Sequence, residues 1–72
     1  MEILAVFKNR SETLKFYKLL LRLGGSGSIV NTPSGLRQGC GISVAIGAQD
    51  QIKAKAIIKE NLFPSFLGFF RR

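Results

Sequence analysis

Histidine is absent from this chain of 72 residues, and Cys40 is its one cysteine. Without histidine, the common zinc-ligand sets and the serine or cysteine triads that use it cannot form within one chain. A single cysteine also excludes an internal disulfide and a Cys-x-x-Cys pair that would carry heavy metals. Much of enzyme chemistry is excluded by these absences, and neither a metal nor a cofactor is expected.

Acidic residues are also few. Four Asp and Glu stand against eleven Lys and Arg, which gives a formal net charge of +7. An excess of this size favours acidic proteins, nucleic acid or anionic membranes as neighbours, and the charge alone does not choose among them.

Long apolar runs are missing as well: none reaches about 18 residues, and no basic segment leads into a cleavage site near the N-terminus. We therefore expect a cytoplasmic protein with a reduced thiol and no membrane partner. The length leaves room for one domain, residues 1–72, without a separate substrate domain. A binding protein is accordingly favoured over a turnover enzyme that acts on a large substrate.

Apolar periodicity predicts four strands and two helices in the order βαββαβ. The strands are expected over residues 3–7, 28–32, 42–47 and 66–70, and the helices over 13–23 and from Gln49 or Asp50 to Pro64. This order predicts an α+β fold, the ferredoxin-like sandwich, with a four-stranded, mainly antiparallel sheet and both helices on one face. Residues 34–39 show neither period and are expected to form a loop.

The first helix carries clear end signals. Asn9, followed by Glu12 three residues later, resembles a capping box, and Gly24 with Gly25 provides the stop. A helical wheel divides the side chains into two faces: Lys15, Lys18 and Arg22 toward water, and Leu14, Tyr17, Leu20 and Leu21 toward the core. In the second helix the expected buried stripe is Ala54, Ile57, Ile58 and Leu62, with Lys55 and Lys59 outward.

The first and the last expected strands of the chain are apolar on both faces. The first strand has Ile3, Ala5 and Phe7 on one face and Leu4 and Val6 on the other, and in the last strand Phe66 and Phe70 alternate with Leu67 and Phe69. Only one set can face the helices, so the other is expected to lie in water on a monomer. Exposed apolar patches of several hundred Å² usually mark interaction surfaces, which predicts a homodimer or a partner on the open sheet face.

Cys40 lies in the segment Arg37-Gln38-Gly39-Cys40-Gly41. The flanking glycines leave the sulfur and the neighbouring N–H groups open to a ligand, and Arg37 is close enough in sequence to favour a thiolate. The alternative is a small buried hydrophobe, because Cys40 has the parity of the apolar residues of the third strand. The residues alone leave both interpretations open.

The motif Thr32-Pro33 … Leu36 … Gly39-Cys40-Gly41-Ile42-Ser43-Val44, placed between a βα unit and an amphipathic helix, resembles the Se/S carrier protein-like family of small bacterial domains. The similarity covers nearly the whole chain, and its specific part is Pro-x₆-Cys-Gly running into an apolar strand. In this chain Ser34 stands where the family usually has an arginine, and Arg37 stands where it usually has a serine.

This resemblance implies a carrier that holds sulfur or selenium on Cys40 as a persulfide or perselenide. Arg37 would stabilise the anionic sulfur, Gly39 and Gly41 would add backbone N–H groups, and Pro33 would anchor the loop. Proteins that donate and accept the chalcogen would be its partners.

Two other functions compete with the carrier. A small interaction or regulatory domain without catalysis is the main alternative, because only Cys40 and its loop argue against it. An RNA-binding module is less favoured: such modules stack bases on aromatic residues of the first and third strands, and here Phe7 is the only aromatic in either.

Overall fold

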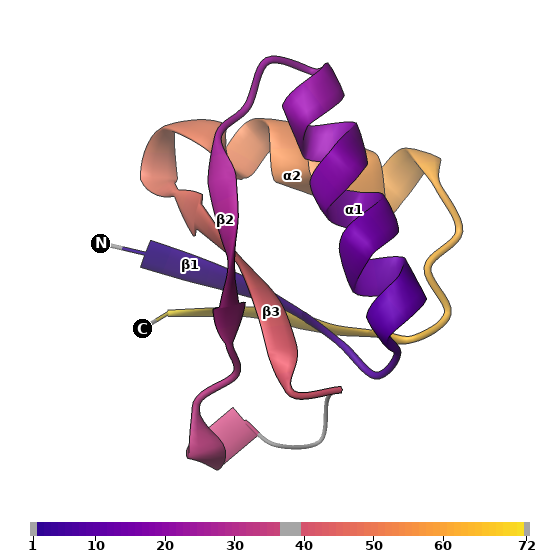
Figure 1. Cartoon of the computed structure of the whole chain (residues 1–72). Helices are drawn as coiled ribbons and strands as arrows, with labels where there is room; N and C mark the ends of the chain where they lie inside the picture. The colour runs from indigo at the N-terminus through magenta and orange to yellow at the C-terminus, as the bar shows by residue number, and fades with distance from the viewer. Residues whose placement is uncertain (1, 37–39, 72) are drawn as a thin grey trace.

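Both helices lie on one face of a single antiparallel sheet whose strand order is β2-β3-β1-β4 (Figure 1). The computed structural model describes residues 2–36 and 40–71. Its elements are β1 (Glu2–Phe7), α1 (Arg10–Arg22), β2 (Gly27–Asn31), η1 (Ser34–Leu36), β3 (Ile42–Gly47), η2 (Ala48–Asp50), α2 (Gln51–Glu60) and β4 (Phe66–Arg71). The predicted α+β, ferredoxin-like βαββαβ fold is confirmed, and a short 3₁₀ helix, η1, occupies the first part of the expected loop.

The ends of α1 form as its sequence predicts. The Asn9 side chain caps the helix by accepting the Glu12 N–H at 2.8 Å. At the other end Gly24 adopts φ +82°, and the Gly25 N–H donates to the Leu20 carbonyl at 3.0 Å. A left-handed residue of this kind closes a helix C-terminus at little steric cost only when it is glycine.

The core between the helices and the sheet is built around aromatic rings. Phe7 of β1 is fully buried, with ring centroids 5.3 Å from Phe16, 5.4 Å from Phe63 and 5.2 Å from Phe66. The whole cluster comprises Ala5, Phe7, Phe16, Leu20, Val44, Ile46, Ala54, Ile57 and Phe63. Because Phe7 points into this layer, it is unavailable for stacking on a base.

Two leucines predicted in the core lie at the surface. The buried residues of α1 are Thr13, Phe16 and Leu20, whereas Leu21 is 45% exposed. The face of α1 that contacts the sheet is centred on Thr13, Phe16 and Leu20. A helical wheel of apolar residues alone omits Thr13 and therefore predicts a face rotated toward Leu21. Leu62 is 84% exposed, since α2 ends at Glu60 and the stripe does not continue beyond it.

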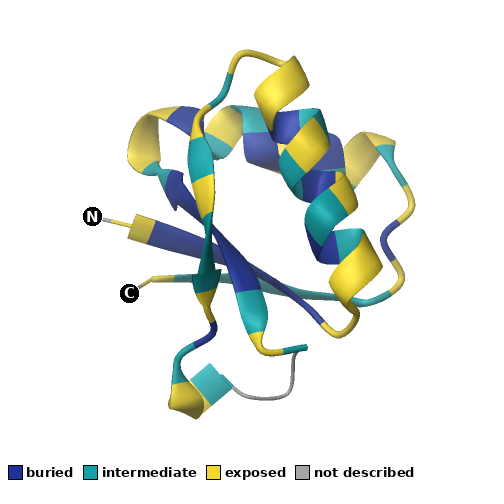
Figure 2. Cartoon of the chain, in the orientation of Figure 1, coloured by how far each residue is buried: buried dark blue, intermediate teal, exposed yellow. Residues whose placement is uncertain are grey.

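The other face of the sheet is better covered than its topology suggests. Leu4, Val6 and Ala45 are at most 4% exposed, so the expectation that Leu4 and Val6 lie in water is wrong (Figure 2). The partly buried side chains packed on them are Val30, Leu36, Leu67 and Phe70. A second, smaller core therefore forms on this face, and Leu36 of η1 is part of it.

A bulge in β4 explains how one strand supplies both cores. Gly68 has φ +143°, and the β1–β4 register shifts between Val6 and Phe7. Phe66 and Phe69 consequently contact the helix-side core, whereas Leu67 and Phe70 contact the smaller one. The predicted strict alternation of Phe66 and Phe70 with Leu67 and Phe69 is wrong for this reason.

The two ends of the described chain meet at one edge of the fold. Ile3 of β1 pairs with Arg71 of β4, and the chain ends lie close together in Figure 1. Within the described ranges, no helix has both the length and the apolar character needed to cross a bilayer.

Candidate functional site

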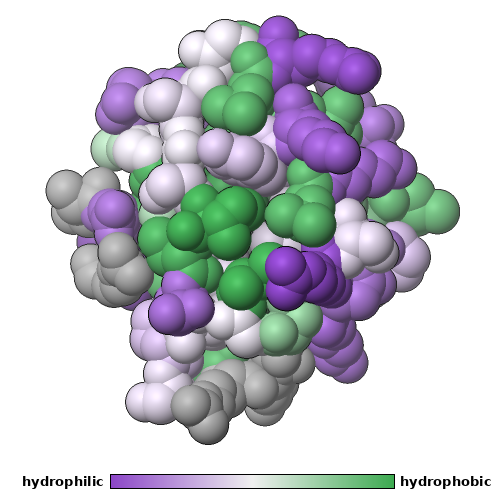
Figure 3. Space-filling model, in the orientation of Figure 1, coloured by the Kyte–Doolittle hydropathy of each residue, from purple (hydrophilic) through white to green (hydrophobic). Residues whose placement is uncertain are grey.

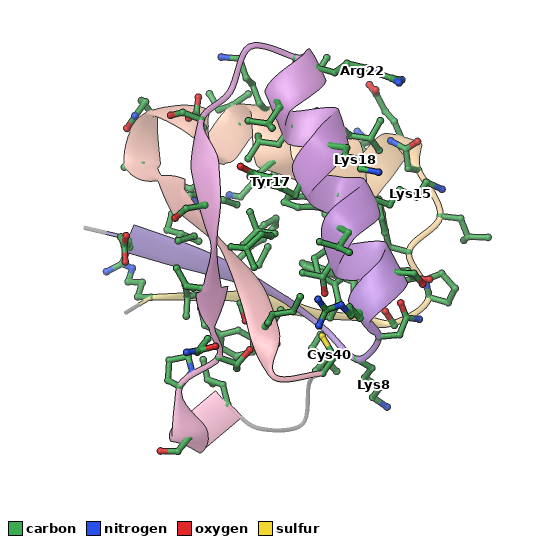
Figure 4. The ribbon with its side chains drawn as sticks, in the orientation of Figure 1. Lys8, Lys15, Tyr17, Lys18, Arg22 and Cys40 are labelled. Carbon is green, nitrogen blue, oxygen red and sulfur yellow. The ribbon has the colours of Figure 1, made fainter. Side chains whose placement is uncertain are left out.

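Cys40 lies at the opposite end of β1, directly before β3. Its backbone N–H donates to the carbonyl of Phe7, the last residue of β1, at 3.2 Å. Its sulfur lies on the helix side of the sheet, 3.5 Å from the hydroxyl of Thr13 in the first half of α1. Figure 4 shows the thiol near the end of α1 where the helix begins, at the same end of the molecule as Lys8.

The hydrogen bonds around the sulfur are those of a thiol that donates. The Thr13 hydroxyl gives its one proton to the Asn9 carbonyl at 3.0 Å, so it offers Cys40 a lone pair. A second acceptor, the Ile42 carbonyl, lies 3.6 Å from the sulfur. For the Thr13 hydroxyl to donate to an anionic sulfur, it must turn away from Asn9.

The exposure of Cys40 is intermediate between that of an open, accessible thiol and that of a buried apolar residue. The side chain is half-buried, on the side that strand parity predicts. Thr13 beneath it is fully buried, whereas the next residue, Gly41, is exposed. Cys40 is thus partly exposed as a residue, and its sulfur rests on the buried Thr13 hydroxyl on one side.

The backbone next to Cys40 has a conformation that requires glycine. Gly41 adopts φ +95°, and its carbonyl accepts the Thr32 N–H at 2.9 Å. Pro33, on the other arm of the loop, accepts the Leu36 N–H at 2.9 Å and so begins the turn of η1. Arg37 and Gly39, the other two predicted site residues, lie outside the described residues.

A buried pair of hydroxyls supports the base of the same loop. Thr32 Oγ1 and Ser43 Oγ are 2.6 Å apart and both side chains are buried. Each hydroxyl satisfies the other on the face where the smaller core lies, so neither is left as an unpaired polar group. The pair holds the end of β2 against the start of β3. Cys40 lies two residues before β3 begins.

Thr13 is the residue of this site that sequence reasoning missed. Its position is three residues before Phe16 and seven before Leu20, which places all three on one helix face. A polar residue in phase with a buried stripe was the available signal. Threonine carries little weight in an apolar pattern, so periodicity alone does not single out Thr13.

A polar cluster holds the start of α1 beside the site. The Ser65 hydroxyl and the Ser65 N–H both donate to Glu12 Oε1, at 2.6 Å and 2.9 Å. The hydroxyl hydrogen bond is the main reason that the pKa of the Glu12 carboxyl lies below its usual value of 4.5, and burial opposes this effect. Asn9 joins the cluster by donating its N–H to Ser65 Oγ at 3.4 Å.

Metal-binding groups do not gather near Cys40. Among residues 2–36 and 40–71, no three His, Cys, Asp or Glu side chains come close enough to hold a metal ion. The chemistry that the described residues offer here is that of one thiol, a buried hydroxyl and backbone carbonyls.

Comparison with known proteins gives one result. The family model described as Putative Se/S carrier protein-like matches residues 2–65, which includes Cys40 and every element from β1 to α2. Searches of the curated proteins and of the solved structures found no match.

Proposed function

We propose, from the premise that the chain belongs to the Se/S carrier protein-like family, that Cys40 carries a sulfur or selenium atom between two partner proteins. The observation that supports this most directly is the half-buried position of the one cysteine, beside a buried hydroxyl at the end of the sheet. A carried atom needs access on one side and support on the other, and a partly exposed residue beside Thr13 supports the proposal on both counts.

The proposed capture step is a nucleophilic displacement. The Cys40 thiolate attacks the terminal sulfur of a donor persulfide, and a new bond forms between the Cys40 sulfur and that atom. The S–S bond of the donor breaks, and its electron pair leaves on the donor thiolate. The terminal sulfur keeps its proton, so Cys40 becomes Cys–S–SH without an external oxidant. A perselenide forms in the same way.

Release repeats the displacement with the roles exchanged. An acceptor thiolate attacks the terminal atom, and the electron pair of the broken bond returns to the Cys40 sulfur. Negative charge develops on Cys40 during this step, and in the proposal Thr13 turns its hydroxyl from Asn9 to the sulfur to stabilise it. Arg37 and the N–H groups of Gly39 and Gly41 are proposed to assist, with Pro33 anchoring their loop.

Mass spectrometry tests the carrier directly. The protein is incubated with a cysteine desulfurase and cysteine, and the mass of the Cys40 peptide is measured. We expect added sulfur on the wild type and none on Cys40→Ser. A wild type that gains no mass, beside a known carrier that does, overturns the proposal.

Alkylation of the folded protein separates the carrier from the main alternative, an interaction or regulatory domain. A carrier needs a thiol that reacts in the native state, so we expect iodoacetamide to modify Cys40 without denaturant. A thiol that reacts only after unfolding behaves as a core residue and contradicts the carrier.

The predicted homodimer and the cytoplasmic location belong to this proposal. Coverage of Leu4 and Val6 leaves a smaller apolar surface than the sequence implied. What is left is a hollow of about 220 Å³ lined by Val6, Gly35, Leu36, Leu67 and Phe70. Light scattering at micromolar concentration tests the dimer, which a monomeric mass contradicts.

A further inference from the structure

The outer face of α1 combines cations with apolar side chains in one shallow groove. It has a volume of about 440 Å³ and is lined by Ser11, Leu14, Lys15, Lys18, Leu19 and Arg22. These residues follow helical spacing, so they lie on one side of the helix. Figure 3 shows hydrophilic side chains gathered over this part of the molecule, and Figure 4 shows Lys15, Lys18 and Arg22 in succession along α1.

The cations of this groove have no ion-pair partner among the described residues. Lys15, Lys18 and Arg22 are all exposed, and among residues 2–36 and 40–71 none forms an ion pair, since the pair found there joins Lys53 to Asp50. Lys15 lies over the Phe63 ring at 5.5 Å and interacts electrostatically with Glu12. Lys18 and Arg22 are therefore exposed cations that a partner can contact.

Two of the four acidic side chains, Glu12 and Asp50, have other roles in the fold. The Glu12 carboxylate accepts two hydrogen bonds from Ser65. Asp50 is 5% exposed and accepts the Ser26 N–H and hydroxyl. With four acidic residues in a chain of net charge +7, the basic groove complements an acidic surface on another molecule.

We infer that this groove on α1 docks an acidic helical segment of a partner protein. Leucines flank the cations, which suits an amphipathic helix that sets an apolar stripe on Leu14 and Leu19 and presents carboxylates to Lys18 and Arg22. The 13 residues of α1 are about 20 Å long, which matches roughly four turns of a partner helix. Single-stranded RNA fits less well, because the neighbouring ring of Phe63 is buried and offers no stacking surface.

The position of the groove connects it to the carried atom. It begins at Ser11, in the first turn of α1, and the thiol of Cys40 contacts Thr13 in the same part of the helix. A helix docked along α1 brings its own protein to the end of the fold where Cys40 lies. This last step rests on the proposed function, whereas the docking itself does not.

The test is a titration of the ¹⁵N-labelled full chain with an amphipathic peptide of glutamate and leucine, followed by NMR. We expect the amide shifts to concentrate on residues 11–22. The double variant K18E/R22E is expected to weaken binding about tenfold, because two ion pairs are lost and replaced by repulsion. The matched control is K55E/K59E on α2, which reverses two exposed lysines at the same spacing, lowers the net charge equally, and is expected to bind within about twofold of wild type.

Each result decides the inference. Equal weakening by both double variants would mean that net charge, not the groove, drives binding, and shifts scattered over the molecule would mean the same. Oligouridine or phosphatidylglycerol vesicles that shift residues 11–22 at lower concentration than the peptide would assign the surface to RNA or lipid. Cys40→Ser is expected to bind like wild type, so a failed carrier assay and a failed docking assay are separate outcomes.

Discussion

The hydroxyl of Ser65 donates to the carboxylate of Glu12 at 2.6 Å and joins residues 53 positions apart in the chain. This contact connects the segment before β4 to the first turn of α1, the helix that carries both Thr13 and the basic groove. The geometry of the candidate site therefore depends on a hydrogen bond that lies outside it.

The Glu12 contact predicts a pH dependence of stability. The pKa of Glu12 is lowered in the folded protein, chiefly by the Ser65 hydroxyl, so its stabilising contribution is present above the unfolded value of about 4.5 and is lost as pH falls through the lower folded value. Glu12→Gln should lower the melting temperature at pH 7, and this difference should shrink toward pH 3. A difference that stays constant over this range would contradict the assignment.

The smaller core predicts a large effect from a position expected to be solvent-exposed. Leu4 is fully buried on the face opposite the helices, so Leu4→Ala should reduce the free energy of unfolding by about 2–5 kcal/mol. Leu62→Ala is the matched control, because Leu62 is 84% exposed and its truncation should change stability by no more than about 0.5 kcal/mol. Urea unfolding measures both, and similar effects would show that Leu4 is not packed.

The bulge in β4 predicts a specific need for glycine. Gly68 has φ +143°, and an added Cβ would lie 3.4 Å from the Phe70 ring, so Gly68→Ala should destabilise the fold by about 1–3 kcal/mol. Gly35→Ala is the control: Gly35 lacks a positive φ and has no atom within 4 Å of an added Cβ. That substitution should be neutral or slightly stabilising. Thermal unfolding of the two variants separates strain from a general effect of alanine.

Two substitutions of Thr13 separate the role of its hydroxyl group from the role of its side-chain volume. Thr13→Val keeps the buried volume but removes the hydroxyl, so it should slow the release of the carried atom from Cys40 to an acceptor thiol about tenfold while costing about 1 kcal/mol of stability. Thr13→Ser retains the hydroxyl and should restore most of the rate. Mass spectrometry of single-turnover transfer from the loaded protein to an acceptor thiol measures this, and equal rates for the valine and serine variants would remove Thr13 from the mechanism.

Local signals predicted much of the fold. The Asn9 cap, the Gly24 stop and the apolar runs are encoded by residues close together in sequence, and each element formed within a few residues of its expected bounds. The covering of Leu4 by Leu36 and Phe70 depends on residues about 30 and 65 positions away, which periodicity cannot pair. The Gly68 bulge, which reassigns the faces of β4, is likewise a backbone event that an alternating pattern does not show.

The sequence indicates the cysteine of the candidate site but not the residues that surround its sulfur. Cys40 was identified because a lone cysteine between glycines is conspicuous in sequence. Thr13 lies 27 positions earlier, on a helix, and only the tertiary fold brings its hydroxyl to the sulfur. Contacts of this kind follow from how α1 crosses the sheet, which no spacing rule specifies.

The pairing of Ile3 with Arg71 makes the molecule convenient to immobilise. Cys40 is hydrogen-bonded at the far end of β1, and six residues of strand are about 20 Å long. An affinity handle fused at either terminus would hold the protein on a bead with Cys40 at the end of the fold away from the bead. Transfer from a loaded bead to a soluble acceptor could then be followed without separating two proteins of similar size.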